Sequence, residues 1–85
     1  MHTKEDVATE TYIRALHFYA VRKLPSGEWA ALRMGQNTVD LCTGIQSDGG
    51  CDRRWCYIRE SDAIRALRAW DGSGNPSGHW VMMRR

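Results

Sequence analysis

The chain of 85 residues lacks any long apolar run, which argues against a membrane-spanning helix. A bilayer requires roughly 20 consecutive apolar residues, and no segment approaches that length. The N-terminal segment also lacks the apolar core of a secretory signal and the arginine-rich, acid-poor composition of a transit peptide. We therefore expect a cytoplasmic protein, with no membrane partner, in a compartment where thiols normally stay reduced.

Motifs for catalysis are absent as well. Gly72, Gly74 and Gly78 follow the predicted helix instead of opening one, so they do not form a phosphate-binding loop. Carboxylates are not paired at a spacing typical of acid–base catalysis, and no Cys/His pair carries a recognised signature. The sequence therefore favours a non-enzymatic protein, and no pattern in it indicates a cofactor.

The chain has three cysteines, and their spacing is incomplete for a structural zinc site. Cys51 and Cys56 are separated by four residues in a turn-rich segment, which is half of such a pattern, but a second pair is missing. We expect three free thiols that pack as small hydrophobic groups. The alternatives are a Cys51–Cys56 disulfide in an oxidising compartment and a zinc ion. The candidate zinc ligands are Cys42, Cys51, Cys56 and His79.

The composition is that of one small globular domain covering residues 1–85. Hydrophobic residues make up 42% of the chain and charged residues 26%, as in ordinary folded proteins. A chain of this length buries only about 60–65% of its unfolded surface, so its four tryptophans and three tyrosines must supply much of the core. The net charge is only +2, but ten of the twelve basic residues are arginine, which suits phosphates, carboxylates and aromatic rings.

The strongest local signal is a hairpin over residues 18–34. Its turn, residues 25–28 with the sequence PSGE, has proline at the first corner and glycine where a positive φ is required. Closure of the loop on Leu24 and Trp29 predicts an antiparallel pair whose alternate residues lie on opposite faces.

The two faces of this hairpin differ in composition. One has the character of a core and carries Tyr19, Val21, Ala30, Leu32 and Met34. The other is basic and aromatic and carries Phe18, Arg22, Leu24, Trp29, Ala31 and Arg33. Arginine and tryptophan together are typical of interaction surfaces. The predicted partner-binding residues are Phe18, Arg22, Trp29 and Arg33. The alternative is a half-solvated sheet surface, and a one-residue bulge would exchange the two faces.

The remaining pattern indicates one helix and several strands. Strand character is found over residues 38–45, 55–59 and 79–83, and residues 46–54 have loop composition. An amphipathic helix is predicted over residues 61–71, with Ser61 as its N-cap and Gly72 just past its end.

The N-terminal segment, residues 1–10, is predicted as a flexible arm. Thr3 followed by Asp6 loosely resembles a capping box, but the β-branched residues that follow disfavour a helix of more than one turn. We expect a strand from Thr11 onward, and a helix over residues 6–16 is the alternative.

These elements predict an α+β fold: an antiparallel sheet of about four strands with one helix packed on one face and the other face open. The open face would carry the partner-binding residues, so we expect a small protein-binding module of adaptor or inhibitor type that binds a protein or a second copy of itself. Nucleic-acid binding through the same face is the alternative. A secondary basic set could extend the surface: Arg53, Arg54, Arg65, Arg68, Arg84 and Arg85.

The order of these elements resembles one known family. A hairpin with a Pro-Ser-Gly turn and an aromatic flank, followed by the capped helix SDAIRALRAW, is similar to the sheet-plus-helix DNA-binding modules at the start of phage integrases. The resemblance lies in element order, without a shared residue motif, and implies the nucleic-acid alternative. The size also fits small inhibitors encoded by phages or plasmids.

Overall fold

The described part of the chain forms five strands and two helices. A computed structural model describes residues 3–84. The elements in chain order are α1 (Lys4–Ala15), β1 (Tyr19–Lys23), β2 (Trp29–Met34), β3 (Val39–Ile45), β4 (Cys51–Tyr57), α2 (Glu60–Ala69) and β5 (Trp80–Arg84). The strands form one antiparallel sheet in the order of the chain. The α+β class is therefore confirmed, whereas the prediction of four strands and one helix is wrong.

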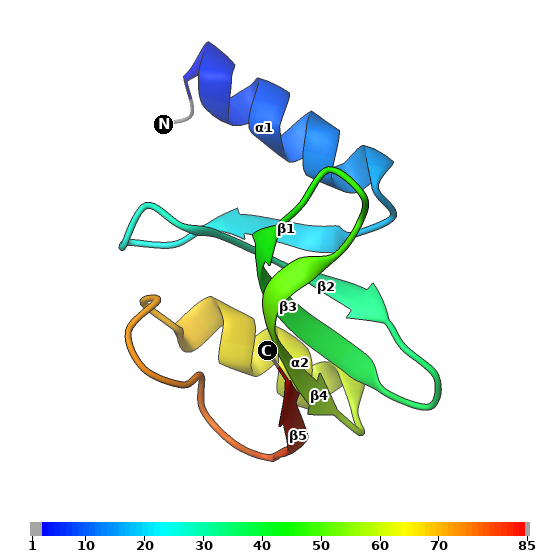
Figure 1. Cartoon of the computed structure of the whole chain (residues 1–85). Coiled ribbons are helices and arrows are strands. Elements are labelled where there is room, and N and C mark those ends of the chain that lie inside the picture. The colour runs from blue at the N-terminus through cyan, green and yellow to red at the C-terminus, as the bar shows by residue number, and fades with distance from the viewer. Residues whose placement is uncertain (1–2, 85) are drawn as a thin grey trace.

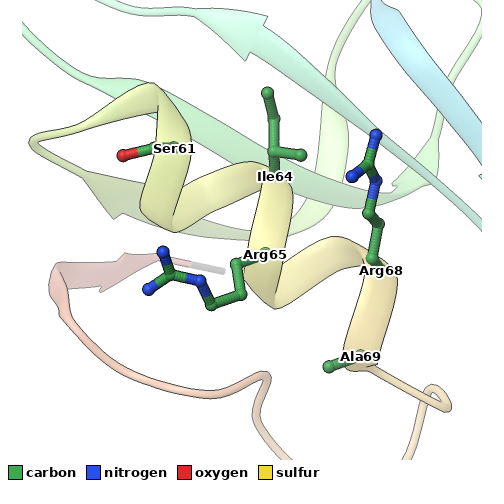
Figure 2. A pocket seen from close by; sticks show the side chains of 5 residues that line it. All are labelled: Ser61, Ile64, Arg65, Arg68 and Ala69. Atoms are coloured by element: carbon green, nitrogen blue, oxygen red, sulfur yellow. The ribbon is translucent and has the colours of Figure 1, made fainter.

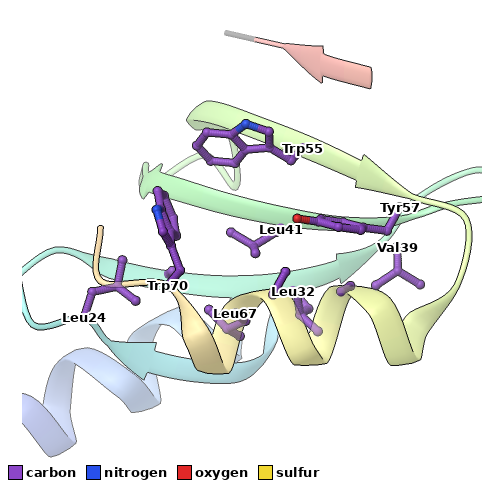
Figure 3. Packing of buried hydrophobic residues seen from close by; sticks show 11 residues of the cluster. Leu24, Leu32, Val39, Leu41, Trp55, Tyr57, Leu67 and Trp70 are labelled. Atoms are coloured by element: carbon purple, nitrogen blue, oxygen red, sulfur yellow. The ribbon is translucent and has the colours of Figure 1, made fainter. Parts of the chain in front are cut away.

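Helix α2 covers one face of the sheet and encloses the main core (Figure 3). Its inward residues Ala63, Ala66 and Leu67 are buried, and the two alanines allow the helix to lie close to the strands. The rings of Trp55 and Trp70 meet edge to face, with centroids 5.0 Å apart and an angle of 74° between the planes. Trp55, Tyr57 and Trp70 are the aromatic side chains that this cluster buries.

Helix α1 lies on the opposite side of the sheet (Figure 1). Ile13 and Phe18 are each 3% exposed and pack against Ala31 and Cys42 of the sheet. The prediction that this face is open is therefore wrong, because α1 covers part of it.

The formation of α1 corrects the flexible arm predicted for residues 1–10. Thr3 is the N-cap, and its hydroxyl accepts a hydrogen bond of 3.0 Å from the backbone N–H of Asp6. The β-branched residues lower helix propensity by only a few tenths of a kcal/mol each. Burial of Ile13 outweighs that cost, so the alternative helix over residues 6–16 was closer to the structure than the arm.

Two predicted boundaries shift. Strand β4 begins at Cys51, so the loop predicted over residues 46–54 is only five residues long, and the CDRR segment pairs with β3. Helix α2 begins at Glu60 after an N-cap at Arg59 that makes no side-chain capping bond, so Ser61 is not the cap. Within residues 3–84, neither helix has the length and apolar composition needed to cross a membrane.

Candidate functional site

The predicted basic and aromatic face is divided by a β-bulge in β1. Tyr19 lies opposite Leu32 and Arg22 opposite Ala30, with one register shift between them, and Ala20 has a φ of +52°. The turn closes on Leu24 and Glu28 instead of Trp29, since the Leu24 N–H donates to the Glu28 carbonyl at 2.8 Å. Strand β1 is thus out of phase with the pairing that the sequence predicted.

The four predicted partner-binding residues consequently separate. Phe18 is buried beneath the guanidinium of Arg33, whose Cζ lies 4.9 Å from the ring centroid, and Trp29 is half-buried beside the same cluster. Arg22 projects toward the other face, where it donates hydrogen bonds of 2.7 Å to the carbonyl of Leu67 in α2 and to that of Trp70, the C-cap of this helix. The prediction of a shared exposed face is therefore wrong.

The secondary basic set does not share one face either. The Cζ of Arg53 lies 5.2 Å from the ring of Trp55 and 5.9 Å from that of Trp70, on the α2 side of the sheet. Arg54 belongs to the α1 side, where its Nε is 3.8 Å from a carboxylate oxygen of Asp40. These two neighbours in sequence therefore point to opposite faces.

The remaining members of the set lie on α2 or at the end of the chain. Arg65 and Arg68 are exposed on the outer flank of α2. Arg84 contributes backbone to β5, but its side chain and the whole of Arg85 lie outside the described part of the chain.

A groove lies between the flank of α2 and strand β1. Its first part is a hollow of about 600 Å³ on α2, lined by Ser61, Ile64, Arg65, Arg68 and Ala69 (Figure 2). Its second part is a hollow of about 400 Å³ lined by Tyr19, Ala20, Val21, Arg22, Glu60, Ile64, Leu67 and Arg68. The two parts share Ile64 and Arg68, which project to the same side of the helix. We call this surface the α2–β1 groove.

The charges of the α2–β1 groove differ between its two sides. Arg68 has no ion-pair or hydrogen-bond partner among residues 3–84, whereas Arg65 lies 3.7 Å from Asp62 with its side chain 78% exposed. Glu60 accepts a hydrogen bond of 2.8 Å from the hydroxyl of Tyr19. Burial, together with this carboxylate, raises the pKa of Tyr19 to about 12. The groove thus contains the cation of Arg68, which has no partner in the described chain, and the carboxylate of Glu60, which already accepts a hydrogen bond from Tyr19.

Strand β1 is a terminal strand, and its free edge faces the same groove. It pairs only with β2 in the described sheet, so part of its backbone has no ladder partner. The strand residues Tyr19, Ala20, Val21 and Arg22 all line the hollow beside α2. Backbone hydrogen-bonding groups, an apolar floor and a free cation are therefore adjacent.

A second polar site lies on the α1 side, beyond the part that α1 covers. Asp40 is only 4% exposed and accepts a hydrogen bond of 2.8 Å from the Thr38 hydroxyl. A Cβ added at Gly35 would stand 2.6 Å from Oγ1 of Thr38 and 2.8 Å from Oδ2 of Asp40, so a larger residue here would displace these side chains. The Nε of Arg54 is buried without a hydrogen-bond partner, and Arg33 lines the same hollow of about 360 Å³.

The cysteines divide between this site and the cluster under α1. All three thiols are free; Cys42 and Cys56 are buried and Cys51 is half-buried. His79 is exposed, and within residues 3–84 no group of three or more His, Cys, Asp or Glu side chains is placed to hold a metal ion.

The Cys42 thiol donates a hydrogen bond to the backbone carbonyl of Asp40, with an S–O distance of 3.9 Å, and Cys51 packs against the cluster that contains Cys42. The influence of Cys42, assisted by Arg33 and Arg54, lowers the pKa of Cys51 to about 7, although burial and Asp40 oppose the shift. The same interaction and burial raise the pKa of Cys42. Sequence reasoning did not predict that these cysteines, arginines and Asp40 lie near one another. The one feature of the sequence that could have indicated a buried polar site is Asp40, a charged residue within an apolar strand.

Comparison with known proteins gives no match: no family model, no curated protein and no solved structure is similar to the chain. The site residues must therefore be interpreted from their geometry alone.

Proposed function

We propose that the protein is a non-enzymatic protein-binding module that holds an extended, acidic segment of a partner in the α2–β1 groove. The unpaired Arg68 beside the free edge of β1 is the observation that supports this most directly. It replaces the predicted Phe18/Trp29 surface, because Phe18 is buried.

An extended peptide fits the shape of the groove. A terminal strand that runs beside a helix is the arrangement used when a peptide adds a strand to a sheet, with backbone bonds giving affinity and neighbouring hollows giving specificity. Here the apolar floor includes Ile64, Ala20 and Val21. Arg68 lines both hollows, so an acidic side chain of the peptide could pair with it from either.

The arrangement of the arginines favours a protein partner over a nucleic acid. Arg53 and Arg54 lie on opposite faces, and each is within 4 Å of a carboxylate: 3.5 Å to Glu28 and 3.8 Å to Asp40. Arg22 is occupied by the end of α2. Phosphate binding requires several cations on one surface, whereas the described arginines are divided between the two faces of the sheet.

Selection from a displayed library of random peptides tests this function. We expect peptides with acidic residues to be enriched, and backbone amide NMR shifts caused by them to map to β1 and α2. The Arg68→Glu variant should weaken binding roughly tenfold or more, because a partly buried charge pair contributes about 1.4 kcal/mol or more.

Arg59→Glu is the matched control. Arg59 is exposed at the start of α2 and lines neither hollow, so its reversal changes the net charge by the same amount and should leave binding unchanged. Equal losses for the two variants, or shifts confined to the β5 edge, would contradict the groove. A salt-sensitive complex with labelled DNA or RNA that Arg68→Glu does not weaken would favour the nucleic-acid alternative.

A further inference from the structure

The polar hollow of about 360 Å³ on the α1 side of the sheet contains three charged side chains from three different strands. Arg33 comes from β2, Asp40 from β3 and Arg54 from β4. None of the three lines the α2–β1 groove. The inference drawn from this hollow is therefore independent of the proposed function.

The register of the sheet brings these side chains to one face. Arg33 lies opposite Asp40, and Asp40 lies opposite Cys56. Cys56 in turn lies opposite Met82 of β5. Residues directly opposite each other in an antiparallel sheet share a face, and Arg54, two residues before Cys56, shares it as well. The row therefore has charged groups at one end and an apolar side chain at the other.

The carboxylate of Asp40 is nearly buried and held in place. Asp40 is 4% exposed, and the Thr38 hydroxyl donates a hydrogen bond of 2.8 Å to its Oδ1. Gly35 leaves the space beside both groups open, since a Cβ there would meet Thr38 and Asp40 at 2.6 and 2.8 Å. The hollow thus keeps one negative charge at a fixed position.

The guanidinium of Arg54 is not saturated by this carboxylate. Its Nε lies 3.8 Å from Oδ2 of Asp40, which is beyond hydrogen-bond reach. Within residues 3–84 this buried Nε has no hydrogen-bond partner. The side chain as a whole is 32% exposed, so solvent reaches the rest of it. A buried donor without an acceptor costs stability, and a ligand that fixes this guanidinium from the open side would recover part of that cost.

The described charged side chains of the hollow leave one positive charge uncompensated, because two guanidinium groups face a single carboxylate. Arg33 donates to the backbone carbonyl of Gly49 and lies over the Phe18 ring, and neither contact neutralises its charge. A singly charged anion balances this excess. A phosphate dianion would add a second negative charge beside Asp40, which like-charge repulsion disfavours.

We propose that this hollow binds a small organic monocarboxylate, with its carboxylate group held by Arg54 and Arg33 and its apolar end against Met82. The guanidinium fork matches the two oxygens of a carboxylate. Met82, 41% exposed, supplies an apolar wall beside the charged groups. A few polar groups beside an apolar wall are typical of small-molecule sites, and the volume of the hollow is near the lower end of their range.

The first test is an NMR titration of the whole protein with straight-chain carboxylates from acetate to hexanoate, each compared with its primary amide at equal ionic strength. The carboxylates should shift the side-chain Nε–H signals of Arg54 and Arg33, and affinity should rise with chain length. The uncharged amides should bind roughly tenfold more weakly or less, because they lose the charge-assisted hydrogen bonds. Inorganic phosphate should bind more weakly than butyrate. Equal binding of butyrate and butyramide, or no shift at either arginine, would overturn the proposal.

Variants test the charge balance. Arg54→Gln should weaken butyrate binding roughly tenfold or more, whereas Arg59→Gln, at an exposed position outside the hollow, should leave it unchanged. Asp40→Asn removes the opposing carboxylate and should strengthen the binding of phosphate severalfold, a gain that misfolding does not produce. Equal losses in the two arginine variants, or an unchanged phosphate affinity in Asp40→Asn, would contradict the assigned roles. Amide NMR spectra of the free variants establish that each is folded.

Discussion

The two faces of the sheet bury side chains of different kinds. On the α2 face, Trp55, Tyr57, Leu32 and Leu41 are all 0% exposed, and the helix closes over them with small residues. On the α1 face, an apolar cluster that contains Phe18 lies beside a buried carboxylate, two arginines and two thiols. The comparison indicates that the α2 face supplies most of the stability, whereas the α1 face keeps polar groups whose burial costs stability.

The largest predicted effect is that of Trp55→Ala. The ring is fully buried and contacts Trp70, so its removal should destabilise the domain by about 4–5 kcal/mol, a large part of the total for a chain of this size. Urea unfolding followed by circular dichroism measures this. Trp29→Ala on the α1 face is the control, since Trp29 is only half-buried. An equal cost for both would contradict the difference between the faces.

Phe18→Ala should have a smaller but clear effect. Its cluster contains fewer buried residues than the α2 core, so we expect about 3 kcal/mol, which includes the loss of the ring beneath the Arg33 guanidinium. The same unfolding experiment applies. The variant should also detach α1, which hydrogen exchange reports as fast exchange in α1 with continued protection in α2. Loss of protection in both helices would show that the two faces unfold together.

One titrating group on each face should give stability an opposite dependence on pH, in two different pH ranges. Burial, with Asp62, raises the pKa of Tyr57 to about 12, so the folded state favours the neutral phenol; its stabilisation is present below pH 10 and is lost as the pH rises toward 12. The lowered pKa of Cys51 stabilises the folded state above the unfolded value near 9, and that contribution is lost as the pH falls toward 7.

Two variants separate these effects. Tyr57→Phe removes the hydrogen bond that the hydroxyl donates to the Ser77 carbonyl at 2.8 Å and should reduce the alkaline loss by about 1–2 kcal/mol. Cys51→Ala should remove the gain in stability between pH 7 and 9. Thermal unfolding measured across this range checks both, and an unaltered profile in either variant would contradict its assignment.

The sequence predicts the α2 face far better than the α1 face, for physical reasons. The helical period around Ala63, Ala66 and Leu67 and the alternation in β3 arise within single segments, so local reasoning finds them. The CDRR segment has no such alternation and becomes a strand because β3 offers it a partner. Helix formation near Ile13 likewise depends on tertiary burial, which propensity does not include.

The candidate site was missed for a related reason. A bulge at Ala20, a residue with no turn signature, reverses the phase of β1 and moves Arg22 to the α2 face. The packing of Cys51 against the cluster that contains Cys42 depends on the pairing of β3 with β4, which no single segment encodes.

The smallest predicted effect, that of Thr3→Ala, tests whether the two faces are energetically separate. The variant removes the hydroxyl that accepts from the Asp6 N–H at 3.0 Å, and loss of an N-cap costs about 1 kcal/mol. If α1 is a weakly attached layer, amide exchange should accelerate in α1 alone, and global stability should fall by less than that amount. Thr9→Ala is the matched control, because alanine at an interior position raises helix propensity and should slow exchange in α1. Equal acceleration in α1 and α2 would mean that the cap contributes to one cooperative unit and that the α1 face is as firmly held as the α2 core.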